Sequence, residues 1–333
     1  MPLKQRDQGV LMRRVHVTVL LGVLIELTAL AQISQACSSC GCTLNSDWSS
    51  QGYTTHSGLH LDLRYDGFDQ DDLRVGDHQL SRHRVVLPDE REVQHKTRNR
   101  NTTIGIDYSP SRNWGVSLQV PYFDRPHSTT LEGETDTTTS HSRGIGDARV
   151  LARYQGFQDD LSYGVQFGLK LPSGKYDDKF RSGPQQGEIV DRGLQVGTGT
   201  TDVLVGVYTA GNLGGGIAYF GSAMWQQPLN SRASFKPGAG ANVTVGVRYR
   251  LTLPMALTPQ LQLNGRYERR ESGPNADIEN SGATLIYLSP GVTFRVLENM
   301  DGFAFVQVPI YQHVTGRQLE PKVLASFGVR YAL

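Results

Sequence analysis

The chain has 333 residues, with 33 Lys and Arg against 32 Asp and Glu, so its formal net charge at pH 7 is +1. Such a balance produces no field that would attract a nucleic acid, and we expect no nucleic-acid partner. The 37 glycines and 15 prolines are spread along the chain without the period of a collagen. No stretch after residue 36 is apolar over about 20 residues, so we expect no transmembrane helix in the mature chain.

Residues 1–36 have the features of a cleaved export signal. Basic residues that include Arg13 and Arg14 precede an apolar centre over residues 17–31, and Ser34-Gln35-Ala36 places small residues where a signal peptidase cuts. The alternative is an uncleaved N-terminal membrane anchor, but the apolar run is short for a membrane span. The sequence therefore predicts export from the cytoplasm.

Residues 37–57 are predicted to form a periplasmic arm that begins with a cysteine cluster. Cys37, Cys40 and Cys42 have the dense spacing that lets thiolates converge on Cu(I) or Zn. Two alternatives are a disulfide with one leftover thiol, which an oxidising periplasm favours, and lipidation of Cys37 after cleavage. Haem attachment is disfavoured because Gly41 stands where a histidine would be needed. A periplasmic metal-handling or redox protein is a candidate partner for this arm.

From residue 58 onward the dominant signal is the alternation of apolar and polar residues. In residues 59–66, Leu59, Leu61 and Leu63 alternate with His60, Asp62 and Arg64. A period of two separates the faces of a β-strand. The pattern recurs in eleven further segments: 103–108, 114–122, 147–154, 163–171, 201–208, 214–225, 242–251, 260–270, 283–297, 302–311 and 323–333. This gives about twelve strands, an even number in the range of outer-membrane barrels.

The connections between these segments alternate in length. Long polar connections are predicted at 67–94, 123–143, 171–198, 226–237, 271–280 and 312–319. Tight ones are predicted at 109–113, 156–160, 210–213, 252–258 and 297–301. Short periplasmic turns alternating with longer external loops are typical of a membrane barrel, whereas a soluble sandwich has no reason to sort its loops in this way.

The predicted fold is an all-β, transmembrane, antiparallel up-and-down barrel over residues 58–333. In lipid every backbone N–H and C=O needs an internal partner, so the sheet must close without an edge. Tyrosines near the predicted strand ends, such as Tyr108, Tyr122 and Tyr249, would form an aromatic girdle, although aromatic residues also favour strands in general. The predicted location is the outer membrane of a Gram-negative bacterium, with its lipid as a partner.

The polar face of the strands provides the candidate site residues. Those predicted to line the lumen and contact a substrate are Asp62, Arg64, Asp147, Arg149, Arg153, Asp202, Arg248, Arg266 and Arg295. Asp147 and Asp202 could pair with arginines such as Arg149 or Arg248, since buried charges need partners, and an ion-pair lattice is the structural alternative to a substrate site. Inward-facing Arg and Lys outnumber Asp and Glu, which favours anionic solutes.

Three motifs carry a resemblance to a known family. Residues 143–155 (RGIGDARVLARYQ), 169–177 (LKLPSGKYD) and 196–208 (VGTGTTDVLVGVY) occur in this order, and residues 287–296 (YLSPGVTFRV) fit a late strand. They resemble the transporter family of outer-membrane proteins associated with the phenol meta-cleavage pathway. The resemblance covers most of residues 58–333 and implies a barrel related to fatty-acid and aromatic uptake channels. The cysteine cluster is not part of that family's pattern.

The sequence thus favours a channel or transporter for passive passage of small solutes, including aromatic or amphipathic ones. The alternative is a non-conducting barrel whose cysteine arm docks a periplasmic metal-handling or redox partner. A barrel lipase would need a serine with a nearby histidine base, and no motif of that kind is present, so we expect no enzymatic activity.

Overall fold

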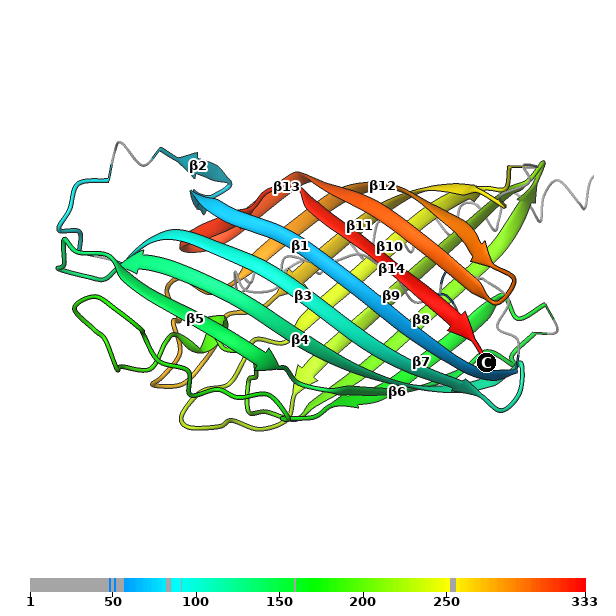
Figure 1. Cartoon of the computed structure of the whole chain (residues 1–333), viewed down its shortest axis with the longest axis horizontal. Helices are drawn as coiled ribbons and strands as arrows, with labels where there is room; N and C mark the ends of the chain where they lie inside the picture. Colours follow the sequence, from blue (N-terminus) through cyan, green and yellow to red (C-terminus); the bar gives the residue numbers. More distant parts are fainter. Residues whose placement is uncertain are drawn as a thin grey trace, which may run out of the picture. The chain divides into compact units, whose positions relative to one another are not determined.

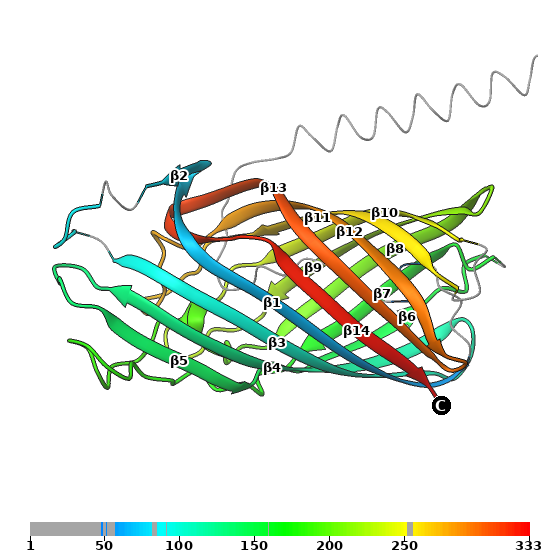
Figure 2. The same ribbon diagram turned by 45° about the horizontal axis from the view of Figure 1, so that its top comes forward.

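The computed structural model describes residues 48, 51, 57–81, 85–90, 92–158, 160–251 and 256–333. In these residues one antiparallel sheet curls into a cylinder and closes on itself (Figures 1 and 2). Closure occurs where strand β1 (Gly58–Gly76) pairs with strand β14 (Leu324–Ala332), from His60 opposite Ala332 to Gly67 opposite Ala325. Every strand of the wall therefore has hydrogen-bonded neighbours on both sides, as a bilayer requires.

Twelve strands form the wall of the described barrel. After β1 come β3 (Val93–Ser109), β4 (Trp114–Thr130), β5 (Thr138–Ile145) with β6 (Arg149–Tyr154), β7 (Tyr163–Lys170), β8 (Asp202–Gly214), β9 (Ile217–Pro228), β10 (Gly240–Tyr249), β11 (Thr258–Glu268), β12 (Ala283–Leu297), β13 (Met300–Pro321) and β14. β5 and β6 count as one interrupted strand because both pair with β4, and β2 (His78–Leu80) is a short extension beside β1. The predicted all-β up-and-down barrel of about twelve strands is confirmed.

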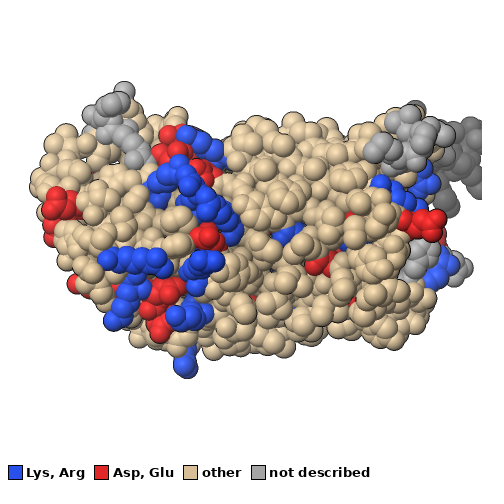
Figure 3. Space-filling view, viewed as in Figure 1, with Lys and Arg blue, Asp and Glu red and all other residues tan. Residues whose placement is uncertain are grey.

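The alternation in the sequence places apolar side chains outside and polar side chains inside. On β3, Ile104 and Ile106 point outward and are 58% and 42% exposed, whereas Asp107 points inward and is 3% exposed. The outward side chains of the other strands are likewise leucines, valines, isoleucines and aromatic residues. We call this zone the apolar belt, and Figure 3 shows it on one face as a wide region with few charged side chains across the middle of the molecule. The protein thus buries polar groups and exposes apolar ones, which is the arrangement that lipid favours.

The strands extend beyond the apolar belt on the side of the long connections. β1 continues to Gly76, β4 to Thr130 and β13 to Pro321, so much of the predicted loops 67–94 and 123–143, and all of 312–319, are strand. The loop predictions are wrong there because these strand segments carry polar residues on both faces and so lack the alternation of the other strands. A strand that has left the membrane faces water on its outside, and it can carry polar residues on both faces while its ladder continues.

Aromatic residues mark both edges of the apolar belt. At the edge toward the long connections, Tyr65, Thr102, Tyr122 and Ile145 lie opposite one another across β1, β3, β4 and β5. At the other edge, Trp114 packs on Tyr154 with ring centroids 4.7 Å apart. Tyr108 and Tyr249 are 53% and 46% exposed there. These positions fit an interfacial girdle. In the described chain no helix is long and apolar enough to cross a membrane.

Candidate functional site

A cavity of about 430 Å³ lies inside the barrel. Its lining contains eight basic side chains, Arg64, Arg125, Arg149, Arg153, Lys170, Arg192, Arg266 and Arg330, and six acidic ones, Asp62, Asp66, Asp107, Asp147, Glu268 and Glu271. Six of the nine residues predicted from the sequence line this cavity, namely Asp62, Arg64, Asp147, Arg149, Arg153 and Arg266. Basic side chains therefore slightly outnumber acidic ones around the cavity.

The other three predicted residues lie elsewhere. Asp202 points inward but is fully buried behind its neighbours. Arg248 donates a hydrogen bond to the backbone oxygen of Gln51 at 2.5 Å. Arg295 lies near the short turns with a side chain that is 56% exposed, and its Nε is 3.2 Å from Asp301. The cavity lining therefore includes the predicted residues of the mid-barrel, but it includes neither Arg248 and Arg295 toward the short turns nor Asp202 at the long-connection end of β8.

Ion pairs across the strands organise the wall of the cavity. Arg330 on β14 holds both carboxylate oxygens of Asp62 on β1, each at 2.8 Å, and so ties together the two strands that close the barrel. Arg153 on β6 binds both oxygens of Asp107 on β3, one of them at 3.1 Å, and also donates to Ser109. Bidentate pairs of this kind hold the guanidinium in one orientation. The sequence missed Arg330 and Asp107 as site residues because their partners come from distant strands.

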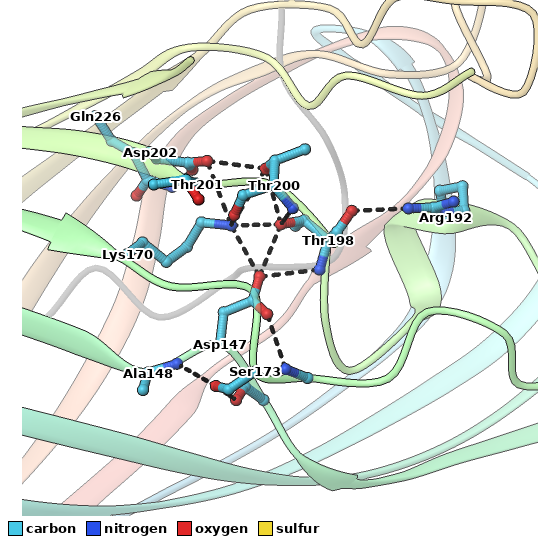
Figure 4. Close-up of polar contacts among 12 residues, drawn as sticks. Asp147, Ala148, Lys170, Ser173, Arg192, Thr198, Thr200, Thr201, Asp202 and Gln226 are labelled. Carbon is cyan, nitrogen blue, oxygen red and sulfur yellow. Dashed lines mark hydrogen bonds and ion pairs between the residues drawn. The ribbon is translucent and has the colours of Figure 1, made fainter. Parts of the chain in front are cut away.

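Lys170 at the end of β7 is the centre of a second network (Figure 4). Its ammonium donates to Asp147 at 2.8 Å, to the Thr200 carbonyl at 3.1 Å and to Thr198 Oγ1, and it lies 3.4 Å from Asp202. All three charged side chains are at least nine-tenths buried. Asp147 and Asp202 were predicted to pair with arginines such as Arg149 or Arg248, but the structure gives them one lysine to share. Lys170 ends its strand within reach of both carboxylates.

Asp147 joins this network to the long connection between β7 and β8, residues 171–201. One carboxylate oxygen accepts from the Gly174 backbone at 3.0 Å, and the other accepts from the Thr198 backbone at 2.9 Å. Asp147 itself lies in the interruption between β5 and β6, where Ser173 replaces the missing strand contacts by accepting from Ala148 and donating to Gly146 (Figure 4). The network therefore fixes both ends of the connection to the wall.

The connection folds into the barrel and narrows its outer end. Its 3₁₀ turn, Arg192–Leu194, places the Arg192 guanidinium 4.5 Å from the ring centre of Tyr176 and 4.7 Å from that of Phe235. Arg125 on β4 donates to the carbonyl of Gln195 at 3.3 Å. Buried guanidinium groups that stack on aromatic rings pack this connection against the barrel wall at this end.

At the opposite end, near the short turns, two residues of the N-terminal arm lie in the lumen. Trp48 is 6% exposed, packs on Phe303 with ring centroids 6.2 Å apart, and lies 5.8 Å from the Arg330 guanidinium. Gln51 accepts the hydrogen bond of Arg248 already described. Of residues 37–57, predicted to form a periplasmic arm, the structure describes residues 48, 51 and 57, and Trp48 lines the cavity, so the assignment of the arm stays a prediction. The Arg330 guanidinium and the Trp48 ring thus make a cation–π contact.

Three carboxylates from separate outer connections approach one another above the barrel. Glu92 precedes β3, Asp191 lies in residues 171–201, and Asp277 follows β11. Burial, together with the charge of Asp191, raises the pKa of Glu92 to about 8. Burial and the charge of Asp277 raise the pKa of Asp191 to about 6. Thr129 donates to Glu92 at 2.5 Å, but no basic side chain is a main influence on either carboxyl.

This cluster predicts that the outer connections are held most tightly at acidic pH. A carboxyl whose pKa is raised in the packed state favours packing while it is protonated, so packing weakens from about pH 4.5, the ordinary value, up to about 8 for Glu92. Hydrogen exchange in residues 185–195, corrected for intrinsic rates, should therefore speed up between pH 5 and pH 9. Glu92→Gln should remove most of this change, whereas Glu132→Gln, an exposed residue nearby, should keep it. An equal response in both variants would assign the effect to other groups.

The cysteine cluster and the export signal lie outside the described residues. Cys37, Cys40 and Cys42 as ligands of Cu(I) or Zn, and residues 1–36 as a cleaved signal, therefore stay predictions. Among the residues that are described, no three His, Cys, Asp or Glu side chains are placed to hold a metal ion.

Comparison with known proteins gives likeness in fold. An outer-membrane channel from Pseudomonas putida F1 superposes with a TM-score of 0.58 at 12% identity, over 84% of this chain and 97% of that one. The monoaromatic hydrocarbon channel CymD gives 0.44 at 9% identity over 91% and 98%. The translocator domain of the autotransporter NalP from Neisseria meningitidis gives 0.45 at 10% identity over 86% and 91%. The first match shows the class of fold, a twelve-stranded barrel of outer-membrane type, and the two lower scores add no argument. No protein-family model matches the sequence. No curated protein matches it either.

Proposed function

We propose that this protein is an outer-membrane channel for passive passage of small solutes. Support comes from the apolar belt, which suits lipid, combined with a polar lumen that contains a cavity. A volume of about 430 Å³ is in the range of pockets that hold small molecules. The structure from Pseudomonas putida F1 that resembles this chain is described as an outer-membrane channel.

The single observation that carries the proposal is the composition of the cavity wall. Basic side chains outnumber acidic ones, and the rings of Trp48, Phe123, Phe235 and Phe303 line the same space. Cationic and apolar groups side by side favour a solute that carries a carboxylate on an aromatic or aliphatic body. The substrate class we propose is therefore small aromatic or amphipathic anions. Phenol-derived acids would fit this chemistry, which agrees with the family resemblance found in the sequence.

Planar-bilayer recording with the purified full-length protein tests this proposal. Under a KCl gradient the reversal potential should show anion preference, and benzoate added to one side should reduce the chloride current by occupying the cavity. Cation preference would reject the anionic substrate class. A barrel that is folded, as judged by heat-modifiable migration on a gel, but shows no current under any condition would reject passive passage. The non-conducting alternative with a docking cysteine arm has no observation among the described residues in its favour.

A further inference from the structure

A row of arginines lies on the outside of the barrel, directly beyond the apolar belt. Arg100 on β3 is opposite Asp124 on β4, and Asp124 is opposite Arg143 on β5. Arg98 lies two residues further along β3, beyond Arg100. Residues opposite one another in an antiparallel sheet share a face, and all three guanidinium groups are exposed. We call Arg98, Arg100 and Arg143 the arginine row. In Figure 3 a band of charged side chains crosses this face over β1, β3, β4 and β5.

The register fixes the height of this row relative to the membrane. The neighbouring row toward the belt is Tyr65, Thr102, Tyr122 and Ile145, already described as the belt's aromatic edge. Two residues along a strand correspond to about 7 Å, so the arginines lie one such step beyond the apolar zone. That is the depth of lipid headgroups rather than of acyl chains. Any group that binds the row is therefore next to the bilayer.

Not every guanidinium group of the arginine row forms an ion pair within the described part of the protein. Arg100 makes no hydrogen bond or ion pair with any residue that the structure describes. Arg143 donates from Nε to the Tyr122 hydroxyl at 2.6 Å and stacks on the same ring, and Asp124, opposite it in the sheet, acts on it as a weaker electrostatic neighbour. Asp124, which lies between them, is bound to His141 at 2.7 Å.

Acidic groups around the row are shared with other cations. Asp69 binds Lys96 at 2.7 Å and Arg98 at 3.3 Å. Asp71 and Asp72 bind Lys322 at 2.8 and 3.1 Å. The acidic side chains are thus occupied, while Arg100 and Arg143 present guanidinium groups about 10 Å apart, two strand spacings, to the headgroup layer. A planar guanidinium binds phosphate oxygens bidentately, and a fixed pair selects a ligand with more than one phosphate.

We propose that the arginine row binds the phosphate groups of an anionic glycolipid in the outer leaflet. The long connections of an outer-membrane barrel face the outside, and the row lies on that side, where phosphorylated glycolipid forms the leaflet. Two exposed guanidinium groups at headgroup depth match a lipid with two phosphates on one sugar headgroup. This inference rests on the proposed outer-membrane location, and it does not require that the barrel conducts.

The test uses the full-length protein in phosphatidylcholine nanodiscs with added diphosphoryl lipid A. Native mass spectrometry should show lipid A bound to the wild type and at least tenfold weaker binding to R100A/R143A. The matched control, R112A/R250A, removes two exposed arginines near the short turns and should bind as the wild type does. Heat-modifiable migration confirms that each variant is folded, and R100K/R143K should recover only part of the binding because lysine lacks the bidentate fork.

Three further arms identify the ligand. Monophosphoryl lipid A should bind less tightly than the diphosphoryl form. Phosphatidylglycerol binding as tightly as lipid A would overturn the glycolipid assignment, as would displacement of lipid A by an equal concentration of inorganic phosphate. Unchanged lipid A binding by R100A/R143A would overturn the site itself. Conductance of this variant in glycolipid-free bilayers should equal that of the wild type, so a failure of the channel proposal remains distinguishable from a failure of this one.

Discussion

Replacing Lys170 with methionine is expected to destabilise the folded barrel by about 3 kcal/mol or more, because it leaves two buried carboxylates without their shared cation. Asp147 and Asp202 are 7% and 0% exposed, so water cannot replace the ammonium group without rearrangement. Methionine keeps the length of the side chain, so the effect reports on charge rather than on lost volume. The measurement is the free energy of unfolding in urea in the presence of detergent micelles or lipid vesicles.

The same variant should release residues 171–201 from the wall. Protease cleavage in this connection should become faster than in the wild type, since Asp147 holds both of its ends. Two controls separate the causes. Lys175→Met removes a lysine of the same connection whose side chain is 66% exposed, and it should change neither measurement. Lys170→Met combined with Asp202→Asn removes one charge of each sign and should recover part of the loss. If Lys170→Met unfolds at the wild-type urea concentration, the network is not a main source of stability.

Replacing Trp48 with alanine is expected to raise the single-channel conductance roughly twofold or more, because a twelve-stranded barrel is narrow enough for one inward side chain to limit its lumen. Trp48 fills the turn end beside Phe303 and Arg330, where it contributes to the lining of the cavity. The variant should also shift the ion selectivity further toward anions, since Arg330 loses the ring that covers it. The measurement is single-channel recording at fixed salt concentration.

Trp114→Ala is the matched control for this experiment. Trp114 is also near the short turns, but it points outward and is 54% exposed, so its loss should leave the conductance unchanged. If Trp48→Ala and the wild type conduct equally, the current does not pass Trp48, and the closure by residues 171–201 sets the resistance. Because both variants are assessed by the current that they conduct, this prediction rests on the proposed channel function.

The strands and their inward and outward faces could be predicted well because they depend on local alternation. The face on which Ile104, Asp107 and Val116 lie follows from their position in the strand alone, because every second side chain points the same way. The strand ends beyond the membrane could not be predicted in this way. From Gly67 to Gly76 the outer face meets water and the alternation disappears, while the hydrogen-bonded ladder to β3 and β13 continues.

The candidate site was predicted in part. Asp62, Asp147 and Arg153 were assigned to the lumen by parity, and the structure places them in the lining of the cavity. Their partners were not predictable, because Arg330 and Asp62 lie 268 residues apart in the chain and meet only when the barrel closes. Lys170 was also overlooked as the shared partner of two carboxylates, although it lies opposite Asp202 in the pairing of β7 with β8 and 23 residues from Asp147 in the chain. The sequence did not indicate the position of Trp48 in the lumen, because Trp48 lies in a polar segment without periodicity.

The sequence by itself determined that this protein is a β-barrel with an apolar exterior and a polar, slightly basic interior, because the alternation of side chains is a local property. Only the tertiary structure decided how the lumen is closed and which charges neutralise one another. Segments that fold inward, such as Trp48 and residues 171–201, take their positions from contacts with several strands at once. Those contacts, such as Arg192 with Phe235 and Trp48 with Arg330, join segments far apart in the chain, and no local pattern encodes them.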